Sequence, residues 1–218
     1  MSPIRCSESM AGFSLLELLL SLSLGLLLSG VMLQGLIDEG QNGQRLARLL
    51  RERAVQRRTL ALVKLDLAQA TGVSQAPERD AHACGLAGRL PVLHLSTAVG
   101  SITYSVGSPP SPIWRGQVLM RCGPAYGLDG VLSTGNTAQN RVVIDGLPAR
   151  PPRWLACGGI LPAHGSDPIE LGDSVALGFS ACLDASSGLV ALRLLQEFPG
   201  RAGRPSQRLM TTAVAGGA

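Results

Sequence analysis

The chain has 218 residues, of which 45% are hydrophobic and 16% are charged. This balance excludes a disordered chain, and the length suits one domain with an accessory element. A formal net charge of +4 is too small to indicate a nucleic-acid-binding protein by itself. Aromatic residues make up only 3%, which argues against a stacking platform for single-stranded nucleic acid.

The most apolar part of the chain is residues 13–37, whose one charged residue is Glu17. About 20 apolar residues, at about 1.5 Å each, cross a bilayer as a helix. A secretory signal peptide is shorter in its apolar part and ends at a small-residue cleavage site, which does not follow here. A plain membrane anchor explains everything except Glu17, because a carboxylate in a membrane helix costs roughly 2.5–3.5 kcal/mol.

A cut between Gly12 and Phe13 would compensate this carboxylate. The new α-amino group would lie four residues before Glu17, about one helical turn away. The carboxylate would also lie at the positive end of the helix dipole. We therefore expect Glu17 to pair with a terminal amine, on its own chain or on a neighbouring one.

The run Gly12-Phe13-Ser14-Leu15-Leu16-Glu17-Leu18 resembles the cleavage signal of type IV pilins and pseudopilins. The resemblance implies cleavage after Gly12 by a prepilin peptidase, N-methylation of Phe13, and docking of Glu17 onto the amine of an adjacent subunit. Residues 1–12 would then be the leader, although their single Arg and single Glu differ from the basic leaders of the family. Residues 62–70 also resemble the helix end of PilW-type minor pilins and J-type pseudopilins, which favours a minor component.

Residues 38–72 are expected to continue the helix as an amphipathic segment. Apolar residues recur there at steps of three, four or seven, which predicts one buried stripe; it comprises Leu46, Leu50, Ala54, Ala61, Leu65 and Ala68, with Leu49 and Leu60 alongside. Thr71 and Gly72 are expected to end the helix. Unbroken helix over residues 14–70 would be about 85 Å long, so its first half needs lipid or sister helices and its second half needs a sheet.

Residues 73–218 are expected to form a β-rich domain, with one antiparallel sheet of five to seven strands. Short runs with strand character are separated by turn residues, at residues 91–97, 101–106, 113–122, 141–145, 174–183, 189–198 and 206–215. The last run is equally compatible with a frayed terminus. Strands grouped after a long helix predict an α+β, pilin-like fold.

Four of the five cysteines lie in this domain and predict two disulfides, for which three pairings exist. We favour Cys84–Cys122 and Cys157–Cys182, each of which would link a loop to a strand. A zinc site that used His82 or His94 with Cys84 is the alternative, but the chain has no Cys-x-x-Cys pair, and structural zinc sites usually contain one.

The cysteines also bear on the orientation of the chain in the membrane. The positive-inside rule would place the arginines that follow the apolar run in the cytoplasm, whereas disulfides form in an oxidising compartment. We follow the cysteines and expect a single-pass inner-membrane protein with a periplasmic domain. The arginines in question are Arg45, Arg48, Arg51, Arg53, Arg57 and Arg58.

The sequence contains neither a GxxxxGK phosphate loop nor a GxSxG elbow. The histidines and aspartates are dispersed, so we expect no enzyme activity, no cofactor and no metal site. The resemblance instead implies a minor subunit of a type IV pilus, whose partners are prepilin peptidase, inner-membrane lipid and other pilins that pack against the N-terminal helix.

Three alternatives to a pilus subunit remain open. One is a pseudopilin of a type II secretion system, and another is a membrane-anchored periplasmic binding domain. The third, a nucleic-acid-binding role, rests only on the arginines between residues 45 and 58.

Overall fold

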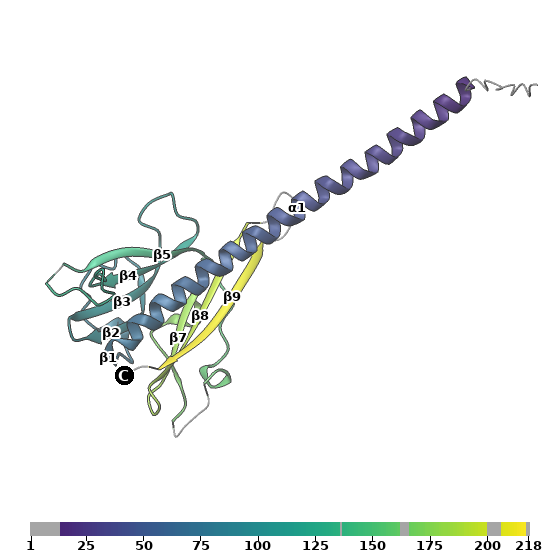
Figure 1. The fold of residues 1–218 in the computed structure, drawn as a ribbon. Helices are drawn as coiled ribbons and strands as arrows, with labels where there is room; N and C mark the ends of the chain where they lie inside the picture. Colours follow the sequence, from purple (N-terminus) through teal and green to yellow (C-terminus); the bar gives the residue numbers. More distant parts are fainter. Residues whose placement is uncertain (1–13, 136, 162–165, 200–205, 217–218) are drawn as a thin grey trace, which may run out of the picture. The chain divides into compact units, whose positions relative to one another are not determined.

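The computed structural model describes residues 14–135, 137–161, 166–199 and 206–216 (Figure 1). The chain divides into two compact units, Met1–Arg51 and Glu52–Ala218. One long helix, α1 (Leu15–Ala68), begins in the first unit and ends in the second. A helix followed by antiparallel strands confirms the α+β class expected from the sequence.

The described part of the first unit is helical. Its Leu15–Gly35 segment is long and apolar enough to cross a membrane, and none of it is buried. Leucine side chains project from every side of this segment and are more than half exposed. An apolar surface of this extent on a helix requires lipid or other protein to cover it.

The second unit contains two antiparallel sheets. In the first sheet the strands lie in chain order: β1 (Ala70–Val73), β2 (Leu90–Thr97), β3 (Gly100–Gly107), β4 (Gln117–Gly123) and β5 (Gln139–Leu147). The second sheet has the order β6 (Ile169–Glu170), β7 (Phe179–Asp184), β8 (Leu189–Phe198) and β9 (Gln207–Gly216). Short 3-10 turns occur at Pro77–Arg79, Cys157–Gly159 and Ser174–Ala176.

The expectation of a single sheet of five to seven strands is wrong. The described residues form nine strands, and β5 and β6 are not paired with each other. Two of the strands, β1 with four residues and β6 with two, are too short to produce a recognisable alternation. A long connection rich in proline and glycine separates β5 from β6, and such a segment does not form a hairpin between them.

Two expected strands begin later than their sequences suggest. β4 begins at Gln117 because Gly116 has a φ of +61°, a left-handed conformation that interrupts an extended run. β7 begins at Phe179 because Ser174–Ala176 forms a 3-10 turn. The C-terminal run is a strand and not a frayed tail, since β9 pairs with β8 along its whole length, from Gln207 opposite Phe198 to Gly216 opposite Leu189.

The expected end of the helix is also wrong. α1 ends at Ala68, and Thr71 and Gly72 belong to β1, which pairs with β2. The hydroxyl of Thr71 donates to the carbonyl of Ser96 at 3.2 Å. The chain therefore passes from helix to strand almost directly, without a glycine-terminated turn.

The buried face of α1 is not the predicted apolar stripe. Leu46, Leu50 and Leu65 are 59%, 54% and 45% exposed. Of the residues expected in or beside the stripe, Leu60 is buried. The face that packs against the sheets lies opposite the stripe, and its residues are Gln56, Thr59, Leu60, Val63, Asp66 and Leu67. Three of these residues are polar, so the spacing of apolar residues does not reveal this face.

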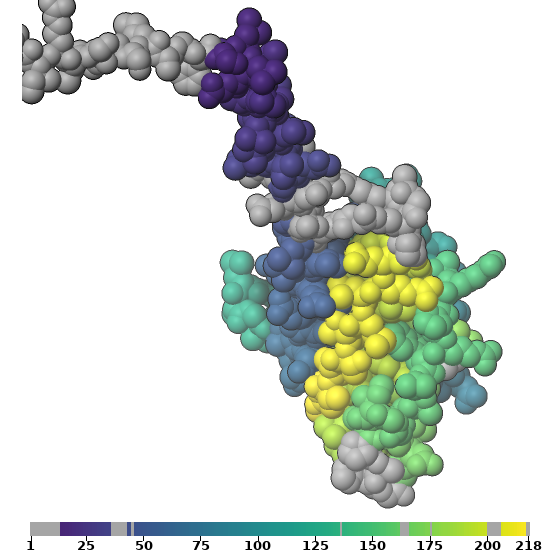
Figure 2. All heavy atoms as spheres, turned by 90° about the vertical axis from the view of Figure 1, so that its right-hand side faces the viewer, coloured from purple at the N-terminus to yellow at the C-terminus, as the bar shows by residue number. Residues whose placement is uncertain are grey.

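The core of the second unit joins the helix to both sheets. Leu60, Val63 and Leu67 of α1 belong to one cluster with residues of both sheets. The rings of Tyr104 on β3 and Phe179 on β7 lie 6.3 Å apart between their centroids, within the range of favourable aromatic pairs. In the space-filling view, the yellow surface of β9 lies beside the blue end of α1 (Figure 2).

This face of the helix can be tested with two matched substitutions. Leu67→Ala removes a fully buried side chain and should lower the free energy of unfolding by about 2–5 kcal/mol. Leu65→Ala, two residues away on the exposed face, should change it by about 0.5 kcal/mol or less. Denaturant unfolding of the full chain in detergent measures both, and equal losses would contradict the observed face.

Candidate functional site

The start of α1 carries the one acidic residue of the apolar segment. The carbonyl of Ser14 accepts hydrogen bonds from the backbone N–H groups of Glu17 at 2.9 Å and Leu18 at 3.1 Å. Glu17 therefore lies in the first helical turn, where the dipole favours a negative charge. The Ser-x-x-Glu spacing is also that of a capping box.

Glu17 is exposed among leucines and makes no ion pair with any residue that the structure describes. Nearby hydroxyls behave differently: those of Ser21 and Ser23 donate to the carbonyls of Leu18 and Leu20 at 3.0 and 2.9 Å. These serines are satisfied within the helix, whereas the Glu17 carboxylate has no ion-pair partner in the described part of the chain. The predicted processing residues Gly12 and Phe13 lie outside the described residues.

The last turns of α1 carry a second acidic residue, Asp66, which is fully buried. Its Oδ1 accepts from Nη2 of Arg121 at 2.9 Å and from the hydroxyl of Tyr126 at 2.6 Å. Its Oδ2 accepts from Nε of Arg121 at 2.7 Å and from the hydroxyl of Tyr104. The remaining terminal nitrogen of the Arg121 guanidinium, Nη1, donates to the carbonyl of Pro124 at 2.9 Å.

This arrangement satisfies both partners of a buried ion pair. Two parallel bonds between a guanidinium and a carboxylate form a bidentate pair, which is stronger and more directional than a single contact. Burial and the Asp66 carboxylate together raise the pKa of Tyr104 and the pKa of Tyr126. The chain has only two tyrosines, and both donate to this one carboxylate.

Gln56 forms hydrogen bonds between α1 and the second sheet, which contains β6 to β9. Its Nε2 donates to the backbone carbonyl of Leu209 at 2.9 Å, and its Oε1 accepts from the hydroxyl of Thr211 at 2.5 Å. Both partners lie on β9. The buried polar residues of α1 therefore anchor it to two sheets, through Asp66 on one side and Gln56 on the other.

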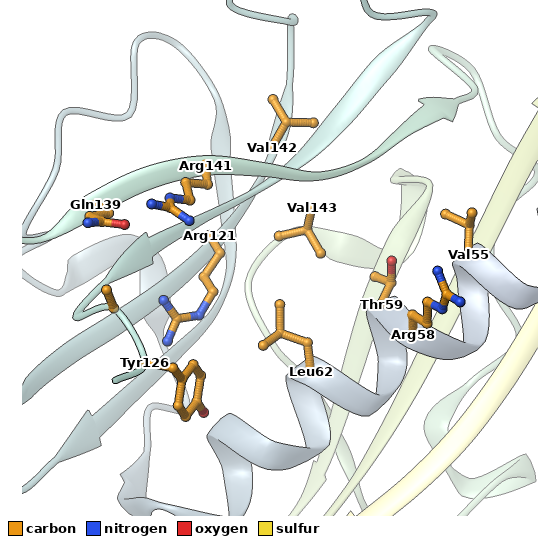
Figure 3. A pocket seen from close by; sticks show the side chains of 11 residues that line it. Val55, Arg58, Thr59, Leu62, Arg121, Tyr126, Gln139, Arg141, Val142 and Val143 are labelled. Carbon is orange, nitrogen blue, oxygen red and sulfur yellow. The ribbon is translucent and has the colours of Figure 1, made fainter. Parts of the chain in front are cut away.

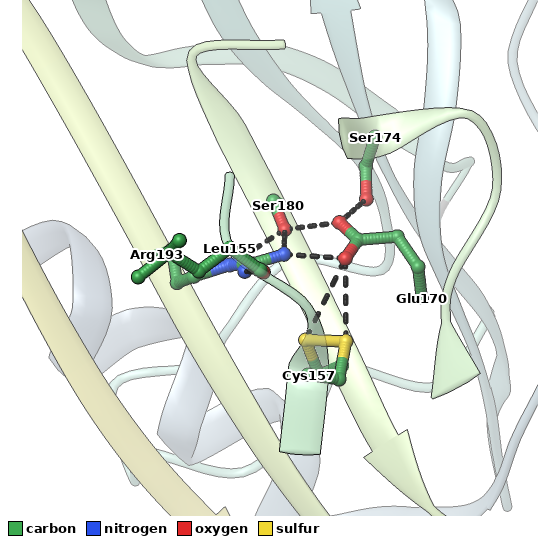
Figure 4. Close-up of a disulfide and its surroundings, with 7 residues drawn as sticks. Leu155, Cys157, Glu170, Ser174, Ser180 and Arg193 are labelled. Atoms are coloured by element: carbon green, nitrogen blue, oxygen red, sulfur yellow. Dashed lines mark hydrogen bonds and ion pairs between the residues drawn. A yellow bond between two sulfur atoms is a disulfide. The ribbon is translucent and has the colours of Figure 1, made fainter. Parts of the chain in front are cut away.

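A third polar cluster lies beside the second disulfide (Figure 4). Arg193 on β8 is buried and forms an ion pair with Glu170 on β6. Its Nε donates to the hydroxyl of Ser180 at 2.9 Å, and its Nη1 donates to the carbonyl of Leu155 at 2.5 Å. The guanidinium carbon lies 5.1 Å from the centre of the Trp154 ring. This cluster joins three strands and the preceding loop, and it has the character of a structural support.

The disulfides join Cys84 to Cys122 and Cys157 to Cys182, with Cα atoms 5.9 and 5.7 Å apart. These are the pairs that the sequence favours, and each one links a segment outside the strands to a strand. Glu170 approaches the second pair, with its Oε2 3.2 Å from the sulfur of Cys157. Because both sulfurs are already bonded, this group of three residues offers one carboxylate and no thiolate to a metal ion.

The histidines of the alternative zinc site bind a hydroxyl in the structure. The Nδ1 atoms of His82 and His94 lie 3.1 and 2.8 Å from the hydroxyl oxygen of Thr103. Burial lowers the pKa of His94, which favours the neutral ring; nearby Asp80 opposes this shift. The sulfur of Cys84, which the zinc alternative needs as a ligand, is bonded to Cys122.

The residues that anchor the helix, Asp66 and Gln56, are not indicated by the spacing of apolar residues. A signal did exist, because Asp66 adjoins Leu67 and follows Val63 by three positions, so it lies on their helix face. A charge in that position requires a buried partner.

No protein-family model, no curated protein and no solved structure matches this chain.

The two tyrosines make the Asp66 cluster visible in an alkaline titration. The folded pKa of each tyrosine is raised above the ordinary value of about 10. The stability they contribute is therefore fully present below pH 10 and is lost as the pH rises toward the folded values. Tyrosinate absorbance should appear only as the protein unfolds; a reversible titration of the folded chain near pH 10 would contradict the cluster.

Removal of the Asp66 charge should destabilise the second unit strongly. Asp66→Asn leaves the Arg121 guanidinium buried without a counter-charge, which should cost about 3–5 kcal/mol. The matched control is Asp145→Asn. Asp145 forms an ion pair at 3.7 Å with Arg115, whose side chain is half exposed, so this substitution should cost about 1 kcal/mol or less. Chemical unfolding of the full chains in detergent measures both losses.

Proposed function

We propose that this chain is a minor pilin subunit of a type IV pilus. It is made as an inner-membrane precursor, cut between Gly12 and Phe13 by prepilin peptidase, and N-methylated at Phe13. It then enters a filament through α1, with its second unit (Glu52–Ala218, here called the sheet unit) in the periplasm. The chain acts by assembling with other subunits.

The observation that carries this proposal is the lone carboxylate in the first turn of a fully exposed apolar helix. Leu15–Gly35 has the length and composition of a membrane span, and Glu17 has no counter-charge among the described residues. An ionisable group in such surroundings is expensive and marks a functional site. A terminal amine at Phe13 of a neighbouring subunit would supply the missing charge and fix the axial register of the two helices.

The surface of the apolar helix suits close packing. Gly25, Gly30 and Gly35 have no neighbouring atoms within 4 Å of the positions where a side chain would begin. Each glycine lets another helix approach the backbone at its own position, and successive glycines lie about 140° apart around the helix. In a filament these positions would receive neighbouring helices, just as lipid covers them in the precursor.

The two disulfides support a periplasmic location of the sheet unit. Such bonds persist in oxidising compartments and are rare in the cytosol. With one crossing by Leu15–Gly35, such a location would leave the proposed cut between Gly12 and Phe13 at the cytoplasmic face of the membrane.

Processing is tested by mass spectrometry of the chain after co-expression with a prepilin peptidase. We expect a mature protein that begins at Phe13, carries one methyl group on that residue, and keeps four cysteines as two disulfides. A peptidase with an inactivated active site is the control and should leave the full precursor. A mature chain that still begins at Met1 would support the plain membrane anchor and would contradict the proposal.

The assembly role of Glu17 is tested separately from processing. Glu17→Ala should still be inserted in the membrane and cut, but its incorporation into sheared filaments should fall at least tenfold. Ser21→Ala is the matched control, because its hydroxyl is satisfied within the helix, and it should assemble normally. Wild-type incorporation of Glu17→Ala, measured by immunoblot of the filament fraction, would refute the pairing.

A further inference from the structure

A groove runs between α1 and strand β5 in the second unit (Figure 3). Its volume is about 700 Å³, within the range of sites that hold a ligand or a short peptide. The helix contributes residues at steps of one turn or less, namely Val55, Arg58, Thr59 and Leu62. Figure 3 shows Leu62 of the helix and Val143 of β5 pointing into the space between the two elements.

The groove follows the edge of β5. Three consecutive residues of this strand, Arg141, Val142 and Val143, line it. Successive residues of a strand point to opposite faces of the sheet, so a space that touches all three runs along the strand edge. β5 is also the last strand of its sheet.

The backbone of this edge is open where the groove lies. At its C-terminal end β5 makes two bonds outside the ladder. Gly146 N–H donates to the carbonyl of Arg115 at 2.7 Å, on the side of β4, and the Asp145 carbonyl accepts from Gln196 Nε2 at 2.7 Å on the outer edge. Within the described part of the chain, residues 139–144 make ladder bonds to β4 alone. An open strand edge is a template for another strand.

The positive charge of the groove indicates which kind of peptide segment would bind there. Three arginines line it, and Arg121 is neutralised by Asp66. Arg58 on the helix and Arg141 on β5 are exposed, and neither makes an ion pair with a described residue. Arg141 and Val143 are two positions apart on β5 and so share one face, which would meet an acidic and an apolar side chain in turn.

We propose that β5 binds an extended, acidic segment of a partner protein by strand addition. The segment pairs its backbone with residues 139–144 of β5. On its inner face, acidic side chains meet Arg141 and Arg58, and apolar side chains lie against Val143 and Leu62. Main-chain bonds of this kind supply affinity, and the alternate side chains supply specificity. The surface lies wholly in the sheet unit and acts independently of processing at Gly12.

The test uses the full chain in detergent and synthetic eight-residue peptides. The probe peptide alternates Glu and Val on one face and has Thr at every other position. The control peptide has Lys in place of Glu. Fluorescence anisotropy of labelled peptides should show binding of the Glu peptide and at least tenfold weaker binding of the Lys peptide. Equal binding of the two, or no binding of the Glu peptide, would overturn the proposal.

Substitutions in the groove locate the binding site. The double variant Arg58→Gln with Arg141→Gln should bind the Glu peptide about tenfold more weakly, which corresponds to about 1.4 kcal/mol. Arg57→Gln is the matched control, because Arg57 is an exposed neighbour on the helix that does not line the groove. If the double variant binds as tightly as the wild type, the segment does not occupy this groove.

Backbone methylation separates strand addition from simple attraction between charges. Two further Glu peptides carry N-methyl groups on alternate amides, one set on each edge of the strand. Methylation of the edge that faces β5 should abolish binding, and methylation of the other edge should leave it unchanged. Equal binding of both peptides, or equal binding of free glutamate, would show a small-anion site and would contradict strand addition.

Discussion

The buried pair of Asp66 and Arg121 is the interaction on which the second unit depends. The Asp66 carboxylate receives two bonds from one guanidinium and one from each tyrosine of the chain. Ten residues earlier, Gln56 bonds to β9 of the other sheet. Because a buried polar group must find its partners, these two residues fix both the rotation of α1 and its position along its axis, which apolar packing alone leaves less specific.

The second half of α1 departs in part from the usual distribution of polar and apolar residues. Beyond the apolar segment, α1 exposes Leu46, Leu50 and Leu65 while it buries Gln56 and Asp66. A buried polar residue costs little stability when its hydrogen bonds are made within the protein. A leucine that stays exposed to water contributes no hydrophobic stabilisation. The outer face of the helix therefore keeps leucines that no described residue covers.

Much of the sheet unit was predictable because its longer strands come from runs with strand character that turn residues separate. The runs that became β2, β3, β5, β8 and β9 were recognised within one to two residues at most ends. The second sheet was not predictable, since strand pattern predicts that a segment is extended but not which neighbour it joins. The helix face was misassigned for a different reason: three of its buried positions, Gln56, Thr59 and Asp66, are polar, and their partners lie far away in the sequence.

The same physical rule explains both the anchoring site and the candidate assembly site. Asp66 and Glu17 are both acidic residues of α1 in surroundings with many leucines, and each requires a cation nearby. Asp66 finds its cation in Arg121 of the same chain, and the helix end is thereby held in place. Glu17 finds none among the described residues, and the proposed function supplies one in the terminal amine of a neighbouring subunit. A carboxylate in apolar surroundings is costly until a cation meets it, and under the proposed function this cost would favour chains that join in one register.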